Sequence, residues 1–432
     1  MAVRDEAQGA RSRGAEAYIK DTSRLRAPRN AAIRPHSHLV GAPLMEKMRC
    51  ILYKAQQSQY DALRCFIDEL YGAFTSFGYE AVIIDPLDKS SSDLFSETVN
   101  KGVDFIVSFN RQGFTGEIRG MPFYEYLKIP FISFMVDAPI HHYNNIAIND
   151  ACVILTFVDK NHVSEVKTNF KTKPVFFLPH GGSIAKTPEK FENRPHDVIF
   201  CGSYEGNEYN NALDWLKQVN SSFITKTFHS MIDMMIQDDT VSYQTAWTSC
   251  TDASSGEYTD LLRHVDMAYR NLVRGHVLES LLFAGVTITC FGNGWENSTL
   301  SKHKNFMYKP AVNFWDAVEE IGKAKICLNI SPMFKNGSHE RVFTAMLSGA
   351  VCLTGENIYF KELFADGDDI LFYRPNNLHG TPQRVIELLN NTDKLMSISG
   401  KAYNKALNGH TWKNRAEFII KIVDAFRGRL KR

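Results

Sequence analysis

Residues 325–354 read KICLNISPMFKNGSHERVFTAMLSGAVCLT, and this stretch decides the fold. It starts with an apolar run, passes through a polar loop, enters an amphipathic segment near Ser338 and ends in a second apolar run. Short apolar runs joined by a helix are typical of parallel strands that are covered on both faces. The stretch therefore predicts a strand–helix–strand unit in an α/β sheet.

The same alternation extends along most of the chain. One series of apolar runs, separated by helix-like segments, comprises MRCILY, YEAVIID, VDFIVSF, PFISFMVD, CVILTF and PVFFLPH. A second series comprises DVIFCGS, VTITCFGNGW, NFMYKP, KICLNISP, AVCLTGE and DDILFY, and helical patterns follow it to about residue 427. We therefore expect an α/β protein with two doubly wound, Rossmann-like domains and a helical C-terminal extension.

Composition shifts suggest where these domains begin and end. The segment GGSIAKTPEKFENRPH, rich in Gly, Pro and charge, predicts a linker between an N-terminal domain at 45–185 and a C-terminal domain at 190–432. A helical excess between Asn207 and Val273 predicts a decoration of the second domain. Residues 1–44 lack apolar periodicity, which predicts a disordered leader or a tail introduced for expression; an arm that binds nucleic acid or a membrane is the alternative.

Composition also bounds the class of protein. The formal net charge is only +1 over 432 residues, so nucleic acid is not an expected partner. The eight cysteines form no Cys-x-x-Cys pair and most lie in apolar runs, as buried free thiols do in a reducing compartment. No apolar run is long enough for a membrane helix, and no signal-peptide pattern is present. We expect a cytoplasmic protein without an integral membrane segment.

The start of the helix after Ser338 predicts an anion site. In an open parallel sheet, ligands bind outside the carboxyl ends of the strands, where loops meet helix N-termini. His339, Glu340 and Arg341 fall at that edge, where free backbone N–H groups and a guanidinium favour phosphate. The structural alternative is a capped helix with an exposed ion pair.

Several motifs together resemble one enzyme family. The strand, the Asn-containing loop, the Glu-Arg helix and the Ser-Gly-Ala turn are followed by GENIYFKELFADGDDILFY and later by HTWKNRAEFI. This order resembles the C-terminal half of GT-B glycosyltransferases of the group 1 type, in particular the spore-coat-type subgroup. The resemblance covers roughly residues 197–420, with a weaker match over 48–183. It implies transfer of a sugar from a nucleotide-diphosphate donor to a hydroxyl-bearing glycan, protein or small molecule, with no cofactor.

The sequence departs from the family pattern at two positions. Many members have Glu where Thr344 stands, and another Glu eight residues earlier, where Asn336 stands here. Both residues form hydrogen bonds but supply no carboxylate, and Glu340 is a partial substitute. Two other functions therefore stay open: a nucleotide-sugar epimerase of the same architecture and a catalytically silent sugar- or nucleotide-binding scaffold.

Glycine-containing turns supply further donor-binding candidates. Gly202 and Ser203 follow one strand, and backbone amides in such a turn approach a phosphate closely. Gly294 and Trp295 follow another, and the indole either lines the nucleotide base or caps the core. Residues predicted to bind the donor are thus Gly202, Ser203, Gly294, Trp295, His339, Arg341 and Thr344. Arg270 and Arg274 are either helpers at the diphosphate or solvated helix charges.

Candidate catalytic residues come from strand ends in the first domain and from the helix start. In MVDAPIHHYNN, Asp137 follows a strand directly and suits general-base work on an acceptor hydroxyl; a structural turn is the alternative. His180 in LPHGG ends another strand beside the linker, and Glu340 completes the set.

Metal ligands are not expected. The DGDD run at 366–369 matches an Asp-x-Asp motif in letters, but it lies where a turn needs Asp and Gly, and the histidines lack ligand spacing.

Overall fold

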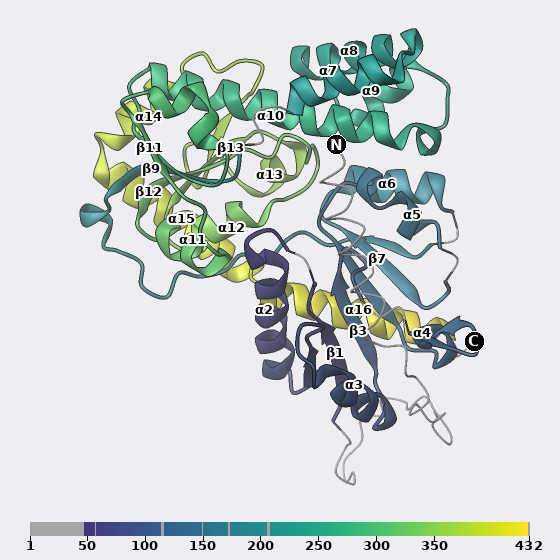
Figure 1. The fold of residues 1–432 in the computed structure, drawn as a ribbon. Helices are drawn as coiled ribbons and strands as arrows, with labels where there is room; N and C mark the ends of the chain where they lie inside the picture. The colour runs from purple at the N-terminus through teal and green to yellow at the C-terminus, as the bar shows by residue number, and fades with distance from the viewer. Residues whose placement is uncertain are drawn as a thin grey trace.

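The computed structural model describes residues 47–430 except 57, 114–115, 149, 172 and 205–207. The predicted leader at 1–44 therefore lies outside the described residues. Two lobes, each built on a parallel sheet flanked by helices, face each other (Figure 1).

The first lobe contains a six-stranded parallel sheet in the order β2-β1-β3-β6-β7-β8. Its strands are β1 (Arg49–Tyr53), β2 (Glu80–Ile84), β3 (Phe105–Phe109), β6 (Phe131–Met135), β7 (Val153–Phe157) and β8 (Val175–Phe177). Between them lie α2 (Ala62–Ser76), α3 (Ser91–Asn100), the small hairpin β4 (Glu117–Ile118) and β5 (Met121–Pro122), α4 (Phe123–Tyr126), α5 (Tyr143–Ile146) and α6 (Lys160–Asn169). β3, β6 and β7 are buried along their whole length, which explains their continuous apolar sequences.

The second lobe contains another six-stranded parallel sheet, in the order β11-β10-β9-β12-β13-β14. Its strands are β9 (His196–Cys201), β10 (Ile288–Phe291), β11 (Phe306–Lys309), β12 (Ala324–Asn329), β13 (Val351–Gly355) and β14 (Leu371–Tyr373). The accompanying helices are α11 (Phe314–Ile321), α12 (Glu340–Leu347), α13 (Ile358–Leu363), α14 (Thr381–Leu389) and α15 (Thr392–Gly409). The two sheets confirm the predicted fold of two doubly wound domains.

Strand order fixes where ligands bind in such sheets. The order reverses between β1 and β3 in the first sheet and between β9 and β12 in the second. Crevices at the carboxyl ends of the strands form at these switch points. The loops that follow β1, β3, β9 and β12 are therefore the ones that frame the site.

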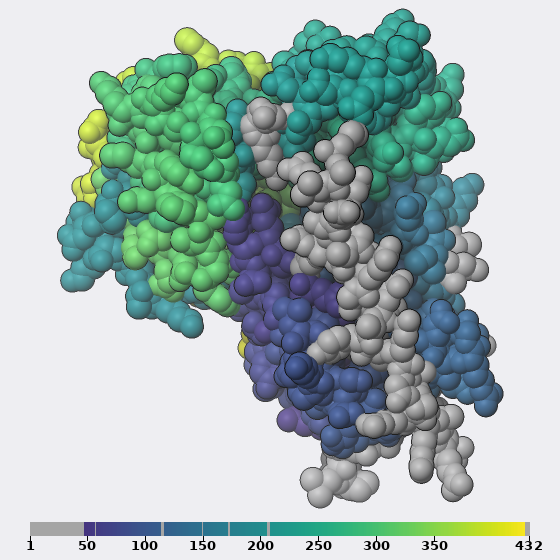
Figure 2. Space-filling view, viewed as in Figure 1, coloured from purple at the N-terminus to yellow at the C-terminus, as the bar shows by residue number. Residues whose placement is uncertain are grey.

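The predicted helical excess forms a group of helices that contacts both lobes. It comprises α7 (Glu208–Val219), α8 (Ser222–Gln237), α9 (Tyr243–Cys250) and the long α10 (Thr259–Phe283). The space-filling view shows the teal helices of this group above the blue part of the first lobe (Figure 2). Tyr243 of α9 donates to Glu165 of α6 at 2.6 Å, which ties the group to the first lobe.

The last helix returns to the first lobe. α16 (Trp412–Leu430) packs on α2 and joins a core cluster that includes Leu52, Phe66, Phe105 and Ile419. Arg427 donates to Asp104 at 2.5 Å in the same region. The sequence grouped this helix with the second domain, because it follows that domain in the chain; its packing is with the first sheet. None of the helices in the described part of the chain is long and apolar enough to cross a membrane.

Candidate active site

A cavity of about 660 Å³ lies between the two lobes at the carboxyl ends of both sheets. Its size is in the range that binds small-molecule ligands. Of the residues predicted from sequence, its lining includes Asp137, His180, Gly202, Ser203, His339, Glu340, Arg341 and Thr344. Residues far apart in the sequence are thus brought to one place.

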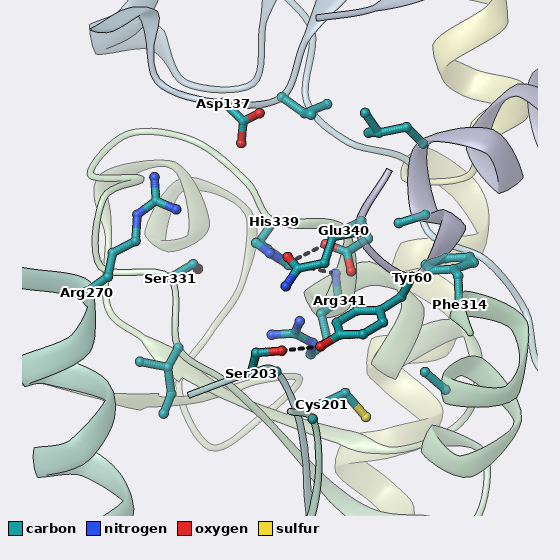
Figure 3. Close-up of a pocket in the computed structure, with 18 of the residues that line it drawn as sticks. Tyr60, Asp137, Cys201, Ser203, Arg270, Phe314, Ser331, His339, Glu340 and Arg341 are labelled. Atoms are coloured by element: carbon teal, nitrogen blue, oxygen red, sulfur yellow. Dashed lines mark hydrogen bonds and ion pairs between the residues drawn. The ribbon is translucent and has the colours of Figure 1, made fainter. Parts of the chain in front are cut away.

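The loop after β9 forms one wall of the cavity. Here the hydroxyl of Ser203 hydrogen-bonds the hydroxyl of Tyr60, which comes from the loop after β1 in the other lobe (Figure 3). Gly292, after β10, allows this wall to form, because a Cβ atom there would lie 2.2 Å from the carbonyl oxygen of Gly202. The two glycine-containing turns therefore pack directly against each other.

The start of α12 forms a second wall and carries the predicted charges. His339 is the N-cap, and its Nδ1 lies 3.3 Å from the backbone nitrogen of Arg341. The same imidazole pairs with the Glu340 carboxylate. Burial raises the pKa of Glu340, but the charge and hydrogen bond of His339 and the charge of Arg341 outweigh it and lower this pKa to about 2. Glu340 is therefore ionised at neutral pH.

Three guanidinium groups face this cavity. Arg341 is held by Asn329, the last residue of β12, at 3.3 Å, and Arg274 of α10 donates to the Ser203 carbonyl. Both lie against the buried ring of Phe200, at 5.8 and 5.7 Å from its centroid. Arg270, one turn before Arg274, is the third. Arg270 and Arg274 are thus cavity residues and not solvated helix charges.

Arg270 is oriented by a buried carboxylate. Asp266 accepts from Arg270 at both oxygens, at 2.9 and 2.6 Å, and also contacts His141 Nε2 of the first lobe at 2.8 Å. Burial raises the pKa of Asp266, but the charge of Arg270 and the hydrogen bond of His141 lower it overall. The guanidinium of Arg270 extends into the space on the side of Asp137 (Figure 3).

Asp137 lies on the first-lobe wall, opposite Ser203 and Arg341 (Figure 3). Its Oδ2 accepts from Asn110 Nδ2 at 2.7 Å and lies 3.6 Å from His142 Nε2. Desolvation raises the pKa of Asp137, but the hydrogen bond and charge of His142, with the charge of Arg270, hold it well below its usual range. Asp137 is therefore ionised, and its side chain, 46% exposed, is accessible.

His180 is buried where the lobes meet. Its Nδ1 lies 2.9 Å from the carbonyl oxygen of Ser338, and burial together with the charge of His339 lowers its pKa to about 4. The ring is therefore neutral at pH 7. With Nδ1–H donating to Ser338, Nε2 is left as an acceptor.

Two of the predicted donor-binding residues, Gly294 and Trp295, pack against the loop after β9 on the side away from the cavity. Trp295 is 0% exposed, donates to the Gly202 carbonyl at 2.7 Å and stacks on Tyr204. Gly294 has φ of +87°, and a Cβ atom there would lie 2.0 Å from the Tyr204 carbonyl oxygen. Neither contributes to the cavity lining, so Trp295 belongs to the core and not to a base-stacking surface.

Thr344 lines the cavity, but its hydroxyl is engaged in the fold. Its Oγ1 accepts the backbone N–H of Ser183 in the interdomain linker at 3.1 Å. Ser348, one turn later, accepts from Ala185 at 3.1 Å in the same way. α12 therefore holds the linker.

The loop before α12 pairs with the first lobe. Asp159 and Gly337 form an antiparallel bridge, in which Ser338 N–H donates to the Val158 carbonyl and Lys160 N–H to the Asn336 carbonyl, each at 3.0 Å. The segment that positions Arg341 is thus anchored on both lobes.

An apolar part of the cavity has no recognisable signal in the sequence. It is formed by the β11–α11 connection and α11, with one residue from the end of β10: Phe291, Val312, Phe314, Val318 and Ile321. The N-cap signal at Asn313 predicts the helix start but not that its apolar residues face a ligand. Asn110 and Tyr60 also line the cavity without a sequence signal, since a single Asn or Tyr carries no spacing pattern.

Within the described residues, no group of three or more His, Cys, Asp and Glu side chains could hold a metal ion. The acidic run at 366–369 is paired instead: Asp366 with Arg384, Asp368 with Lys401 and Asp369 with Lys405. These contacts fit the predicted turn.

Comparison with known proteins agrees with this architecture. Residues 270–421 match the family model described as glycosyl transferase-like. Among solved structures, the chain is similar to an alpha-glucosyltransferase in complex with UDP and DNA (11% identity, 89% of this chain and 100% of that chain, TM-score 0.53). It is also similar to sucrose-phosphate synthase from Thermosynechococcus elongatus (7% identity, 89% and 100%, TM-score 0.52). It spans only 54% of the length of TarM (10% identity, 68% of this chain, TM-score 0.40). No curated protein sequence matches the chain.

Proposed function

We propose that this GT-B glycosyltransferase moves a sugar from a nucleoside diphosphate donor to a hydroxyl group, without a metal ion. The observation that carries the proposal is the convergence of Arg270, Arg274 and Arg341 on one cavity at the switch point of the second sheet. An apolar compartment adjoins these charges. The cavity therefore offers positive charge for the phosphates of a nucleotide and apolar surface for its base.

The diphosphate is assigned to the space between the loop after β9 and the start of α12. The guanidinium groups of Arg274 and Arg341 lie on this side, and the positive end of the α12 helix dipole adds to their potential. Guanidinium groups bind phosphate oxygens in pairs, and they stabilise the charge that develops on a departing diphosphate. This arrangement neutralises a diphosphate without a bridging cation, which is the basis for proposing a metal-independent reaction with no cofactor.

The nucleoside is assigned to the apolar compartment. Val312, Phe314 and Val318 provide apolar surface for a flat base beside the charged region. The similar alpha-glucosyltransferase was solved with UDP, so UDP is the first nucleotide to test.

The acceptor is assigned to the first-lobe wall. The ionised and accessible Asp137 is our candidate for taking the proton of the acceptor hydroxyl as it attacks the sugar. His180, neutral through burial, is an acceptor for a sugar hydroxyl. Glu340, ionised beside His339, is the carboxylate closest in the chain to the position where many family members have Glu.

The test is ligand-induced stabilisation followed by product analysis. UDP at about 100 times its dissociation constant should stabilise the protein by roughly 2.7 kcal/mol, with EDTA present. Arg341→Ala should remove most of this effect while leaving the unliganded protein nearly as stable, since its guanidinium contributes one long hydrogen bond to the fold. Lys421→Ala, a change of an exposed cation on α16, is the matched control.

Product analysis separates the alternatives. Incubation with a panel of nucleotide sugars and hydroxyl acceptors should release the nucleoside diphosphate and form a glycoside. Interconversion of the free nucleotide sugar would indicate the epimerase, and binding without turnover would indicate the scaffold. Loss of the UDP effect in EDTA would refute metal independence.

A further inference from the structure

Asn110 occupies the switch point of the first sheet, directly after β3. Its φ is +51°, and that of the next residue, Arg111, is +53°. Two successive left-handed residues turn the chain sharply at the end of the strand. Asn adopts this conformation more readily than most other non-glycine residues, so the backbone alone accounts for a residue of this type here.

The side chain of Asn110 does more than fit the turn. Its Oδ1 accepts the backbone N–H of Val136 at 2.9 Å, while its Nδ2 donates to Asp137 Oδ2 at 2.7 Å. The Val136 contact fixes which end of the amide is oxygen, so the donor must face the carboxylate. The backbone N–H of Asn110 donates to the Phe134 carbonyl at 2.9 Å, and the residue is only 6% exposed. The amide is therefore held rigidly between the ends of β3 and β6.

We propose that Asn110 is a positioning residue that orients the Asp137 carboxylate toward the acceptor hydroxyl. Because the amide occupies Oδ2, the proton-accepting oxygen toward the cavity is Oδ1. This inference rests on the proposed function, in which Asp137 takes the acceptor proton. Asn110 touches neither substrate in this scheme and acts only through Asp137.

Other titratable or charged groups also face Asp137, and the test has to account for them. They are His141 and His142 on the following turn, Arg270 on α10 and His180 after β8. His142 Nε2 lies 3.6 Å from Asp137 Oδ2. All of these groups stay in place when Asn110 alone is changed, so a shift in pH dependence is attributable to the lost amide.

Two substitutions separate the amide from the turn. Asn110→Gly keeps the left-handed backbone at no steric cost but removes both side-chain hydrogen bonds. Asn110→Asp keeps the shape and the contact to Val136 but sets a second carboxylate against Asp137. A hydrogen bond to the ionised form favours that form, and a like charge disfavours it, so both changes raise the pKa of Asp137.

The readouts are kcat at pH 7 and, where a raised pKa of Asp137 brings it into the range in which the protein is stable, the acidic limb of the pH profile of kcat/KM, which reports the base of the free enzyme. Asn110→Gly should move this limb to higher pH by about 1 to 2 units and lower kcat at pH 7 about 10-fold, with the donor KM unchanged. Asn110→Asp should move the limb further. UDP-induced stabilisation, which involves the other lobe, shows that each variant is folded.

Two further variants make the outcome decisive. Lys128→Gly changes another left-handed residue, with φ of +57°, on the exposed surface and should leave the profile as it is. Asp137→Asn should abolish most transfer. If Asp137→Asn is inactive but Asn110→Gly and Asn110→Asp keep the native profile, the positioning role is refuted and the proposed function stands. If Asp137→Asn transfers at the native rate, the base assignment and this inference both fall.

Discussion

Gly337→Ala tests whether the loop before α12 needs its close contact with the first lobe. A Cβ atom at residue 337 would lie 2.3 Å from the Val158 carbonyl oxygen and 2.6 Å from the Asp159 Cα. These are backbone atoms, so the two segments must separate by several tenths of an ångström or more. Separation breaks the two 3.0 Å bonds of the bridge and the 2.9 Å bond from Asn336 N–H to the Asp159 carboxylate.

The expected loss follows from these three bonds. The two backbone bonds contribute about 0.5 to 1.5 kcal/mol each, and a bond to a carboxylate about 1.5 to 3 kcal/mol. Gly337→Ala should therefore lower the free energy of unfolding by about 2.5 to 6 kcal/mol. It should also weaken UDP binding, because the displaced loop carries the start of α12.

Urea denaturation with linear extrapolation measures the first effect, and UDP titration measures the second. Gly400→Ala is the matched control: this glycine lies within α15 with open space around its Cα. Alanine there should stabilise the protein by about 0.5 to 1 kcal/mol through helix propensity. If Gly337→Ala were as stable as the native protein and bound UDP equally well, the bridge between the lobes would be dispensable and this reasoning wrong.

Three further predictions concern packing and pH. Trp295→Phe should lower the free energy of unfolding by about 1 to 3 kcal/mol, since it leaves the Gly202 carbonyl unpaired, without changing the preference between UDP and GDP; an altered preference would restore the base-stacking role. Thr344→Val should cost about 1 to 3 kcal/mol in urea denaturation by leaving Ser183 N–H unpaired, whereas Thr344→Ser should cost less. His180 and His410 have pKa values lowered by burial to about 4 and about 3, from 6.5. Because the unfolded rings bind protons first, stability measured by urea denaturation should fall as the pH drops from 6.5 toward 4; constant stability over this interval would contradict the buried, neutral state.

The sequence predicts the sheets because each strand carries its own signal. The runs VIFC in β9 and ICL in β12 are continuously apolar and buried, and that pattern arises directly from burial on both faces. The helix starts are likewise marked by capping residues such as Asn313 and Asn357. Packing between segments that are distant in the chain is not predicted by any local sequence pattern. α16 packs on the first lobe through residues such as Trp412 and Ile419. Their apolar character predicts that they are buried, but not against which domain.

Some residues of the candidate site are likewise predictable from the sequence, and others are not. Arg341 and Asp137 were found because they follow strands, and topology brings the carboxyl ends of parallel strands together. Trp295 follows a strand too, but an aromatic residue there packs equally well into the core, and only its contacts decide. Arg270 and Arg274 lie within a long helix, where sequence does not distinguish a cavity charge from a solvated one. Asn110 was missed because its role depends on a φ angle and on a neighbour 27 residues away.

The substitution at Thr344 has a structural rationale in the linker. Where the sequence resemblance predicts a carboxylate, this chain has a hydroxyl that accepts the backbone N–H of Ser183, at a position that is only 1% exposed. Gly182, beside it, lies so close to α12 that a Cβ atom would be 2.6 Å from the Phe343 carbonyl carbon. A glutamate at 344 would have to enter the cavity or displace the linker. α12 therefore serves to hold the linker, and Glu340, one turn earlier and ionised, is the carboxylate that this helix places in the cavity lining.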